Sequence, residues 1–165
     1  MRERVDRFME LLRPLSDAGK LGPVLWQLPP TFQRDDTRLA EALDGLPEGR
    51  HCFEFRHQSW FCPEVIELLR ERGAGLVVGV HPQWPRDDRS RVTDWTYVRF
   101  HYGSRGRAGN FSGTEIDEWG GWVQKRARTG QVYAYFNNDW NAFAVRNAEA
   151  LMAGLGLQRP ATAAW

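Results

Sequence analysis

Short apolar runs alternate along the chain with stretches that repeat apolar residues at helical spacing. The apolar runs, typical of strands, cover residues 21–28, 51–56, 75–80, 95–101 and 131–137. The helical pattern covers residues 2–13, 35–46, 63–72, 114–128 and 141–155. Because strands that alternate with helices pair in parallel, the pattern predicts an α/β fold in which helices cover a parallel sheet.

Capping signals refine these helices. Pro14 is expected to end the first helix, because proline has no backbone N–H to continue it. Asp35 or Asp36 can cap the second, and Ser112 with Glu115 has the spacing of a capping box. We expect the last helix to place four apolar residues on one face: Val145, Ala148, Met152 and Leu155.

Composition bounds the class of protein. The 165 residues suffice for one domain, which we place at residues 1–157 with a loose tail at 158–165. With 22 basic and 21 acidic residues the net charge is +1, so no bulk field attracts nucleic acid or an anionic membrane. The arginine-rich balance is read as codon bias, with bidentate anion recognition as the alternative.

The cysteines and the termini indicate a cytoplasmic location. Cys52 and Cys62 have neither zinc-site spacing nor the density of a secreted disulfide scaffold, so we expect reduced thiols. The charged start of the chain is unlike a signal peptide, and no apolar run is long enough to span a bilayer. We therefore expect no membrane partner.

The polar residues that end the apolar runs are the candidate site, because ligands of parallel α/β sheets bind where the strands end. The candidate catalytic residues are Glu54, His101 and Arg99, with Glu54 or His101 as acid or base. The candidate ligand-binding residues are Gln27, Arg56, His57, Arg105, Tyr135, Asn137 and Asn138.

Each candidate also has a structural interpretation. Glu54 can form a buried ion pair with Arg56 or Arg99 that holds the strands in register. The loop 103–113 has the amides and arginines of an anion site, yet it can equally be a surface loop. Asp139 can be an acid, or it or Asn141 can cap the last helix, and we favour capping for Asp139.

Four aromatic or imidazole residues also have a structural interpretation. His57 and Trp60 can line a pocket mouth, or Trp60 can pack beneath Phe61. Trp119 and Trp122 are assigned to the core. The chain has no metal-binding, nucleotide-binding, serine-elbow or Cys-His motif, so no metal ligand is assigned and the cofactor stays unknown.

Four segments in order resemble the YecE-like family, known as domain of unknown function 72: G-P-V-L-W-Q-L-P-P, F-E-F-R-H-Q-S-W-F, Y-V-R-F-H-Y-G and V-Y-A-Y-F-N-N-D. The resemblance covers residues 5–155. It implies a TIM-type barrel with polar residues at its C-terminal mouth and no established activity.

The chain departs from that family at its start. Members open with an N-terminal portion that contains a G-T-S-G-W-type strand end and further strands, and nothing here matches it. The resemblance then leaves a truncated, partial barrel of about five parallel strands. Two exposed sheet edges would favour a homodimer or a partner chain that covers them.

The leading hypothesis is a YecE-like domain that binds or hydrolyses a small anionic substrate, phosphorylated compounds included, at the C-terminal ends of the strands. One alternative is a non-catalytic binding or interaction module, or an inactive fragment. A metal-assisted phosphodiesterase acting on nucleic acid is a further alternative, which rests on analogy with other barrels alone.

Overall fold

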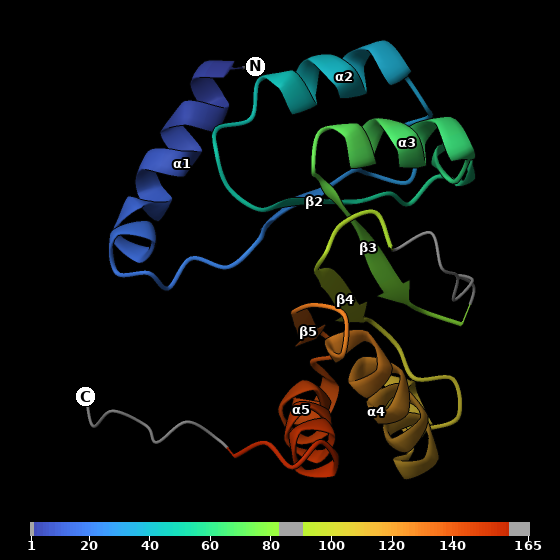
Figure 1. The fold of residues 1–165 in the computed structure, drawn as a ribbon. Coiled ribbons are helices and arrows are strands. Elements are labelled where there is room, and N and C mark those ends of the chain that lie inside the picture. Colours follow the sequence, from blue (N-terminus) through green and yellow to red (C-terminus); the bar gives the residue numbers. More distant parts are fainter. Residues whose placement is uncertain (1, 83–90, 159–165) are drawn as a thin grey trace. The chain divides into compact units, whose positions relative to one another are not determined.

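The computed structural model describes residues 2–82 and 91–158, which fall into two compact units. The first unit holds the described residues up to Val77 together with residues 91–93, and the second holds the remainder from Val78. Five strands follow one another in the sheet order β1-β2-β3-β4-β5 (Figure 1). The elements are α1 (Arg2–Asp17), β1 (Val24–Gln27), α2 (Asp36–Asp44), β2 (His51–Glu54), η1 (Gln58–Trp60), α3 (Pro63–Glu71), β3 (Gly75–Val80), β4 (Thr96–Phe100), η3 (Arg107–Gly109), α4 (Gly113–Ala127), β5 (Val132–Phe136), η4 (Trp140–Ala142) and α5 (Phe143–Gly154).

In the first unit, strand β1 pairs in parallel with β2, from Val24 opposite His51 to Gln27 opposite Glu54. Strand β2 pairs in parallel with the start of β3. Helices α2 and α3 lie side by side (Figure 1). They contribute Leu39, Val65 and Leu69 to a core that also buries Phe53 and Trp60. The register brings Gln27 and Glu54 to the same end of neighbouring strands.

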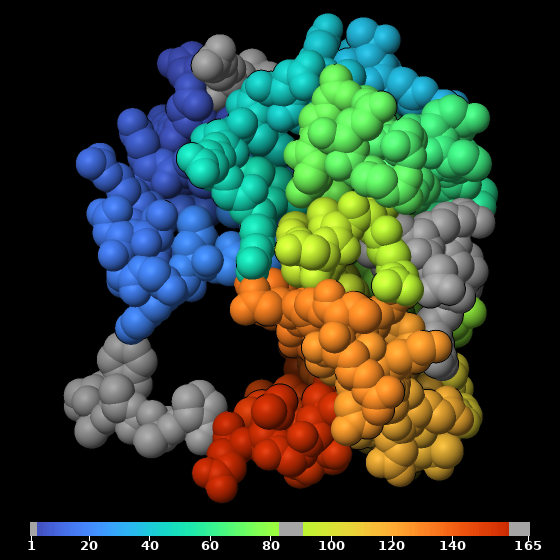
Figure 2. Space-filling view, viewed as in Figure 1, coloured from blue at the N-terminus to red at the C-terminus, as the bar shows by residue number. Residues whose placement is uncertain are grey.

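Helix α1 continues past Pro14 to Asp17, so the prediction that Pro14 ends it was wrong. Proline removes only its own N–H from the helix, while its carbonyl still accepts from the Ala18 N–H at 3.3 Å. The helix instead ends before Gly19, whose φ of +64° favours glycine. Helix α1, dark blue in Figure 2, lies at the surface with three large apolar side chains exposed: Phe8, Leu11 and Leu15.

In the second unit, β4 and β5 pair in parallel from Thr96 opposite Val132 to Phe100 opposite Phe136. Phe100 is fully buried; its ring stacks on Phe136 at 4.3 Å and meets Trp119 edge-on at 5.2 Å. Helices α4 and α5 lie side by side (Figure 1). This packing confirms Trp119 as a core residue.

The predicted inward face of helix α5 is correct except for Val145: Leu155 packs on the core, and Ala148 and Met152 are half-buried. Val145 is 54% exposed, whereas Asn147 and Leu151 are buried. Two hydrogen bonds explain why Asn147 faces inward: its Oδ1 accepts from the Asn138 side chain and from the Phe111 backbone N–H. A hydrophobic pattern alone cannot show that a helix turns an amide into its core.

Most predicted elements are confirmed, and apart from the end of α1 their ends differ by up to three residues. Asp35 caps α2 by accepting from the Arg38 N–H, and Ser112 with Glu115 forms the capping box of α4. Cys52 and Cys62 are free thiols. Of the helices that the structure describes, none combines the length and the apolar character needed to cross a membrane.

Candidate functional site

At the strand ends of the first unit, three predicted residues meet. Arg56 Nε donates to Glu54 Oε1 at 2.9 Å, and Arg56 Nη2 donates to Gln27 Oε1 at 2.9 Å. Strand β2 ends at Glu54, so Arg56 lies just beyond it and can fold back over the carboxylate. Glu54 is 2% exposed and the Arg56 side chain 29%. The predicted ion pair between these two residues is therefore present, with Gln27 as its third member.

His57 and Trp60 have structural contacts in the same unit. The His57 side chain caps η1, where its Nδ1 accepts from the Ser59 N–H at 3.2 Å. Trp60 is buried and stacks on Phe55 at 4.6 Å, and its Nε1 donates to the Phe32 carbonyl at 2.8 Å. Trp60 is thus a core residue, and a ligand contact for His57 stays a prediction.

At the strand ends of the second unit, His101 and Asn137 form a pair. Asn137 Nδ2 lies 2.7 Å from Nδ1 of His101. Because an amide nitrogen donates, Nδ1 accepts in the tautomer that carries the ring proton on Nε2. The pair follows the ladder of β4 and β5, in which Arg99 lies opposite Tyr135. Tyr135, 44% exposed, stacks on Tyr97 at 4.8 Å.

Asn138 is the most buried of the predicted ligand-binding residues in this unit. Its Nδ2 donates to the Gly109 carbonyl at 3.1 Å and to Asn147 Oδ1 at 2.9 Å. Both amide hydrogens are thereby used, which fixes the orientation of the side chain. Asn147 was not predicted as part of the site, because a polar residue in an amphipathic helix gives no sign in the sequence that it is buried.

A pocket of about 390 Å³ lies at these strand ends, lined by His101, Tyr102 and the run from Asn137 to Asn141. We call it the strand-end pocket. The buried Oδ1 atoms of Asn137 and Asn138 have no hydrogen-bond partner among the described residues. Trp140, 75% exposed, and Tyr102 add aromatic surface. Sequence reasoning missed both; an aromatic residue directly after the polar strand end was the available signal.

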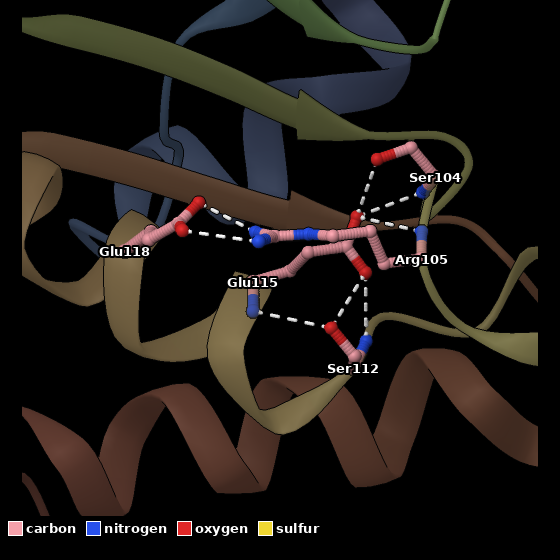
Figure 3. A network of polar contacts seen from close by, with 5 residues as sticks. All are labelled: Ser104, Arg105, Ser112, Glu115 and Glu118. Atoms are coloured by element: carbon pink, nitrogen blue, oxygen red, sulfur yellow. Dashed lines mark hydrogen bonds and ion pairs between the residues drawn. The ribbon is translucent and has the colours of Figure 1, made fainter.

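The loop 103–113, predicted as an anion site or a surface loop, binds the carboxylate of Glu115 from the following helix. The Glu115 carboxylate accepts from the backbone N–H groups of Ser104, Arg105 and Ser112 and from both serine hydroxyls (Figure 3). Burial raises the pKa of Glu115, but the bonds from Ser112 and Ser104 outweigh it and lower the pKa to about 2. Glu115 thus occupies the position that an external anion would take at these amides.

Arg105 also has an internal partner. Its guanidinium donates to both carboxylate oxygens of Glu118, at 3.1 and 2.5 Å (Figure 3). This bidentate pair, led by the hydrogen bond to Glu118, raises the pKa of Arg105. Its side chain is 46% exposed, so a ligand could reach it only in competition with Glu118.

Capping of the last helix by Asp139 or Asn141 was wrong. Asp139 precedes η4 without a side-chain capping bond, and α5 begins after Ala142, whose φ is +57°. The turn is instead made by backbone bonds, from the Ala142 N–H to the Asp139 carbonyl and from the Ala144 N–H to the Asn138 carbonyl, both at 3.2 Å. Asp139 is therefore left at the strand-end pocket.

The structure brings six of the ten predicted residues into two groups, one in each unit: Gln27, Glu54 and Arg56 in the first, and His101, Asn137 and Asn138 in the second. Across residues 2–82 and 91–158, no three His, Cys, Asp or Glu side chains gather as metal ligands would.

Comparison with known proteins agrees with this fold. The family model described as "Protein of unknown function DUF72" matches residues 1–164. A DUF72 family protein from Enterococcus faecalis is similar over 96% of this chain and 67% of its own, at 21% identity and a TM-score of 0.83. One from Thermotoga maritima is similar over 94% of this chain and 65% of its own, at 27% identity and a TM-score of 0.82.

The chain thus spans about two thirds of the length of these solved structures. No curated protein matches it. The likeness confirms the α/β, TIM-barrel-like fold class, here a partial barrel of five parallel strands that alternate with helices.

Proposed function

The chain belongs to DUF72, a family of proteins of unknown function, and we propose that it binds a small, uncharged polar molecule in the strand-end pocket. The observation that supports this is the pairing of His101 with Asn137 beside Asn138 at one concave site. The pocket volume of about 390 Å³ lies within the range of about 300–1,000 Å³ typical of ligand sites.

The proposed ligand is uncharged because of the groups that line the pocket. Among the described residues, neither lysine nor arginine lines it, and its one carboxylate belongs to Asp139. The cations and amides that the sequence predicted for an anion are engaged elsewhere: Arg105 with Glu118, and the loop amides with Glu115. A desolvated anion in the strand-end pocket would find no lysine or arginine among the described lining residues to offset its charge.

His101 is the residue proposed to act as acid or base, as the sequence predicted. Its Nδ1 lies 2.7 Å from Asn137 Nδ2, so Asn137 is proposed as a positioning residue that holds the orientation of the ring.

The test is a thermal-shift screen of the wild-type chain with uncharged, anionic and cationic small molecules. A compound that binds the pocket should raise the melting temperature of the wild type and lose that effect in His101→Ala. The exposed Gln124→Ala variant on α4 is the control, and its response should equal that of the wild type. The absence of any uncharged compound with this pattern would reject the proposal.

A second candidate is the binding or hydrolysis of a small anion at Arg56. It is favoured by the partial exposure of this guanidinium above the buried Glu54. Phosphate and sulfate titrations would test it, because Arg56→Gln should abolish an affinity that Arg56→Lys retains in part. If both variants bind these anions as the wild type does, Arg56 is a structural residue only.

A further inference from the structure

His51, the first residue of β2, is buried with both of its ring nitrogens in hydrogen bonds. It is 5% exposed. The indole Nε1 of Trp26 donates to Nδ1 of His51 at 3.1 Å, and Nε2 of His51 lies 2.9 Å from the Pro47 carbonyl oxygen. The ring therefore joins β2 both to strand β1 and to the loop that precedes β2.

These two partners are compatible with a single tautomer of the neutral ring. An indole N–H can only donate, so Nδ1 of His51 must accept. A carbonyl oxygen can only accept, so Nε2 must carry the ring proton. Neither partner can reverse its role by rotating, as a side-chain amide can. The contacts of His51 are thus satisfied only by the uncharged ring with its proton on Nε2.

Protonation of His51 would set two hydrogen-bond donors against each other. The charged ring carries a proton on both nitrogens, so its Nδ1–H would face the N–H of Trp26. A buried N–H without an acceptor is unfavourable, and the two donors repel, so the contact would open. The bond to the Pro47 carbonyl suits both forms of the ring. Protonation therefore acts on the contact between Trp26 and His51 in particular.

The surroundings of His51 keep the ring neutral near pH 7. Burial lowers the pKa of His51 from 6.5, and the hydrogen bond to the Pro47 carbonyl offsets this only in part. The ring lies against Trp26, Pro47 and Gly49, none of which titrates. The charged residues close in sequence to these contacts and to Phe8 of α1 are exposed to solvent, which screens them: Arg4, Arg7, Glu48 and Arg50.

The sign of the pH dependence follows from this lowered pKa. Below pH 6.5 a ring released from its contacts binds a proton more readily than the ring in place. The contribution of the contact is therefore complete above pH 6.5 and is lost as the pH falls through the lowered pKa.

Trp26 in turn contacts helix α1. The Phe8 ring meets the Trp26 ring edge-on, with 5.7 Å between their centroids. Over residues 3–17 no side chain of α1 is buried. Because so little of this helix is packed, displacement of the indole would remove a substantial part of what holds it.

We propose that Trp26 and His51 form a pH-sensitive latch, which holds helix α1 on strand β1 while His51 is neutral and opens when His51 is protonated. The latch belongs to the first unit, whereas the strand-end pocket belongs to the second, so this proposal does not depend on the proposed function.

The test is a nuclear magnetic resonance titration of the full chain labelled with ¹⁵N, from about pH 8 to about pH 4. The ring nitrogens of His51 report its tautomer and charge, the Trp26 indole signal reports the hydrogen bond, and ¹H–¹⁵N NOEs at Phe8 and Leu12 report the order of α1. At the start of the titration we expect the ring proton on Nε2. On acidification, protonation of His51, a shift of the indole signal and a fall of the α1 NOEs should share one midpoint.

Two variants and a control isolate the latch. His51→Gln has a donor and an acceptor but does not titrate, so its α1 NOEs should stay at their neutral-pH values. Trp26→Phe removes the opposing donor, so the pKa of His51 should shift up towards 6.5 and its protonation should no longer change the order of α1. Glu48→Gln removes an exposed carboxylate from the same loop and should leave the midpoint of the wild type unchanged.

Several outcomes would overturn the latch. They are a ring proton on Nδ1 at the start, a ring that stays neutral to the end of the titration, and a protonation that leaves Trp26 and α1 unchanged. An acid transition of α1 that is identical in His51→Gln would belong to other groups. The signals of β4 and β5 appear in the same spectra, and a transition that includes them would be global unfolding; either result rejects the latch.

Discussion

Ser112 and Glu115 hydrogen-bond each other through backbone and side chain at the start of α4. The Ser112 N–H donates to Glu115 Oε2 at 2.8 Å, and the Glu115 N–H donates to Ser112 Oγ at 3.3 Å. The other oxygen, Oε1, accepts from the Ser104 N–H at 2.7 Å. One buried carboxylate thus joins both ends of the loop 103–113 to the helix that follows it.

The Glu115 network predicts a loss of stability in acid. The folded-state pKa of Glu115 is lowered from 4.5 to about 2, so its contribution is complete above pH 4.5 and is lost as the pH falls towards 2. At about 1.36 kcal/mol per pKa unit, the contribution is on the order of 3 kcal/mol. Urea unfolding from pH 6 to about pH 2 should show a steeper decline for the wild type than for Glu115→Gln.

The matched control is Asp117→Asn, an exposed carboxylate on the same helix. It should keep the acid dependence of the wild type, because Asp117 is not part of the network. Equal slopes for the wild type and Glu115→Gln would show that the carboxylate contributes nothing to the folded state in its charged form.

Two glycines of the second unit should respond in opposite ways to alanine. A Cβ on Gly106 would lie 1.9 Å from the Asn110 carbonyl oxygen, so Gly106→Ala must displace backbone and should destabilise the unit by several kcal/mol, about 2 or more. A Cβ on Gly121, exposed within α4, meets nothing within 4 Å. Gly121→Ala should stabilise by up to about 1 kcal/mol through its higher helix propensity.

Thermal unfolding of the two variants beside the wild type measures both effects at once. Gly106→Ala should melt below the wild type and Gly121→Ala above it. A Gly106→Ala protein as stable as the wild type would mean that the loop does not adopt this close approach.

The pair of Glu54 and Arg56 is open to a double-mutant cycle. Glu54→Gln, Arg56→Ala and their combination should give a coupling energy of about 1–3 kcal/mol in urea unfolding, because the carboxylate is buried at one side of a 2.9 Å bond. The surface pair of Arg72 and Asp44 is the control, with an expected coupling of about 0–1 kcal/mol. A coupling near zero for Glu54 and Arg56 would reject the structural ion pair and favour a role in ligand binding.

The fold was predictable because each element has a local signal. Helix starts could be predicted from the capping residues Asp35, Ser112 and Glu115, and strands from the apolar runs. The prediction that α1 ends at Pro14 failed because a proline destabilises a helix by a limited amount, and a helix can continue past it. Val145 misled because the inward face of α5 was decided by a tertiary hydrogen bond.

The site was predictable only in its residue types. Polar strand ends indicated Gln27, Glu54, His101 and Asn137. In the structure Arg56 bonds to both Gln27 and Glu54, and His101 pairs with Asn137. Which partner each would find depends on contacts remote in sequence. Glu115 is an example: its capping box with Ser112 could be predicted from the sequence, but its hydrogen bond from the Ser104 N–H could not.

Asn147 should stabilise both the fold and the orientation of Asn138. Its buried Oδ1 accepts from Asn138 Nδ2 at 2.9 Å and from the Phe111 N–H at 3.4 Å. Asn147→Leu removes this acceptor from two buried donors and should lower the free energy of unfolding by about 1–3 kcal/mol. Asn147→Asp keeps an acceptor oxygen and should lose less, while the exposed Val145→Ala should lose less than about 0.5 kcal/mol. Urea unfolding ranks the three variants, and an Asn147→Leu protein as stable as Val145→Ala would mean that Asn138 is held by the Gly109 carbonyl alone.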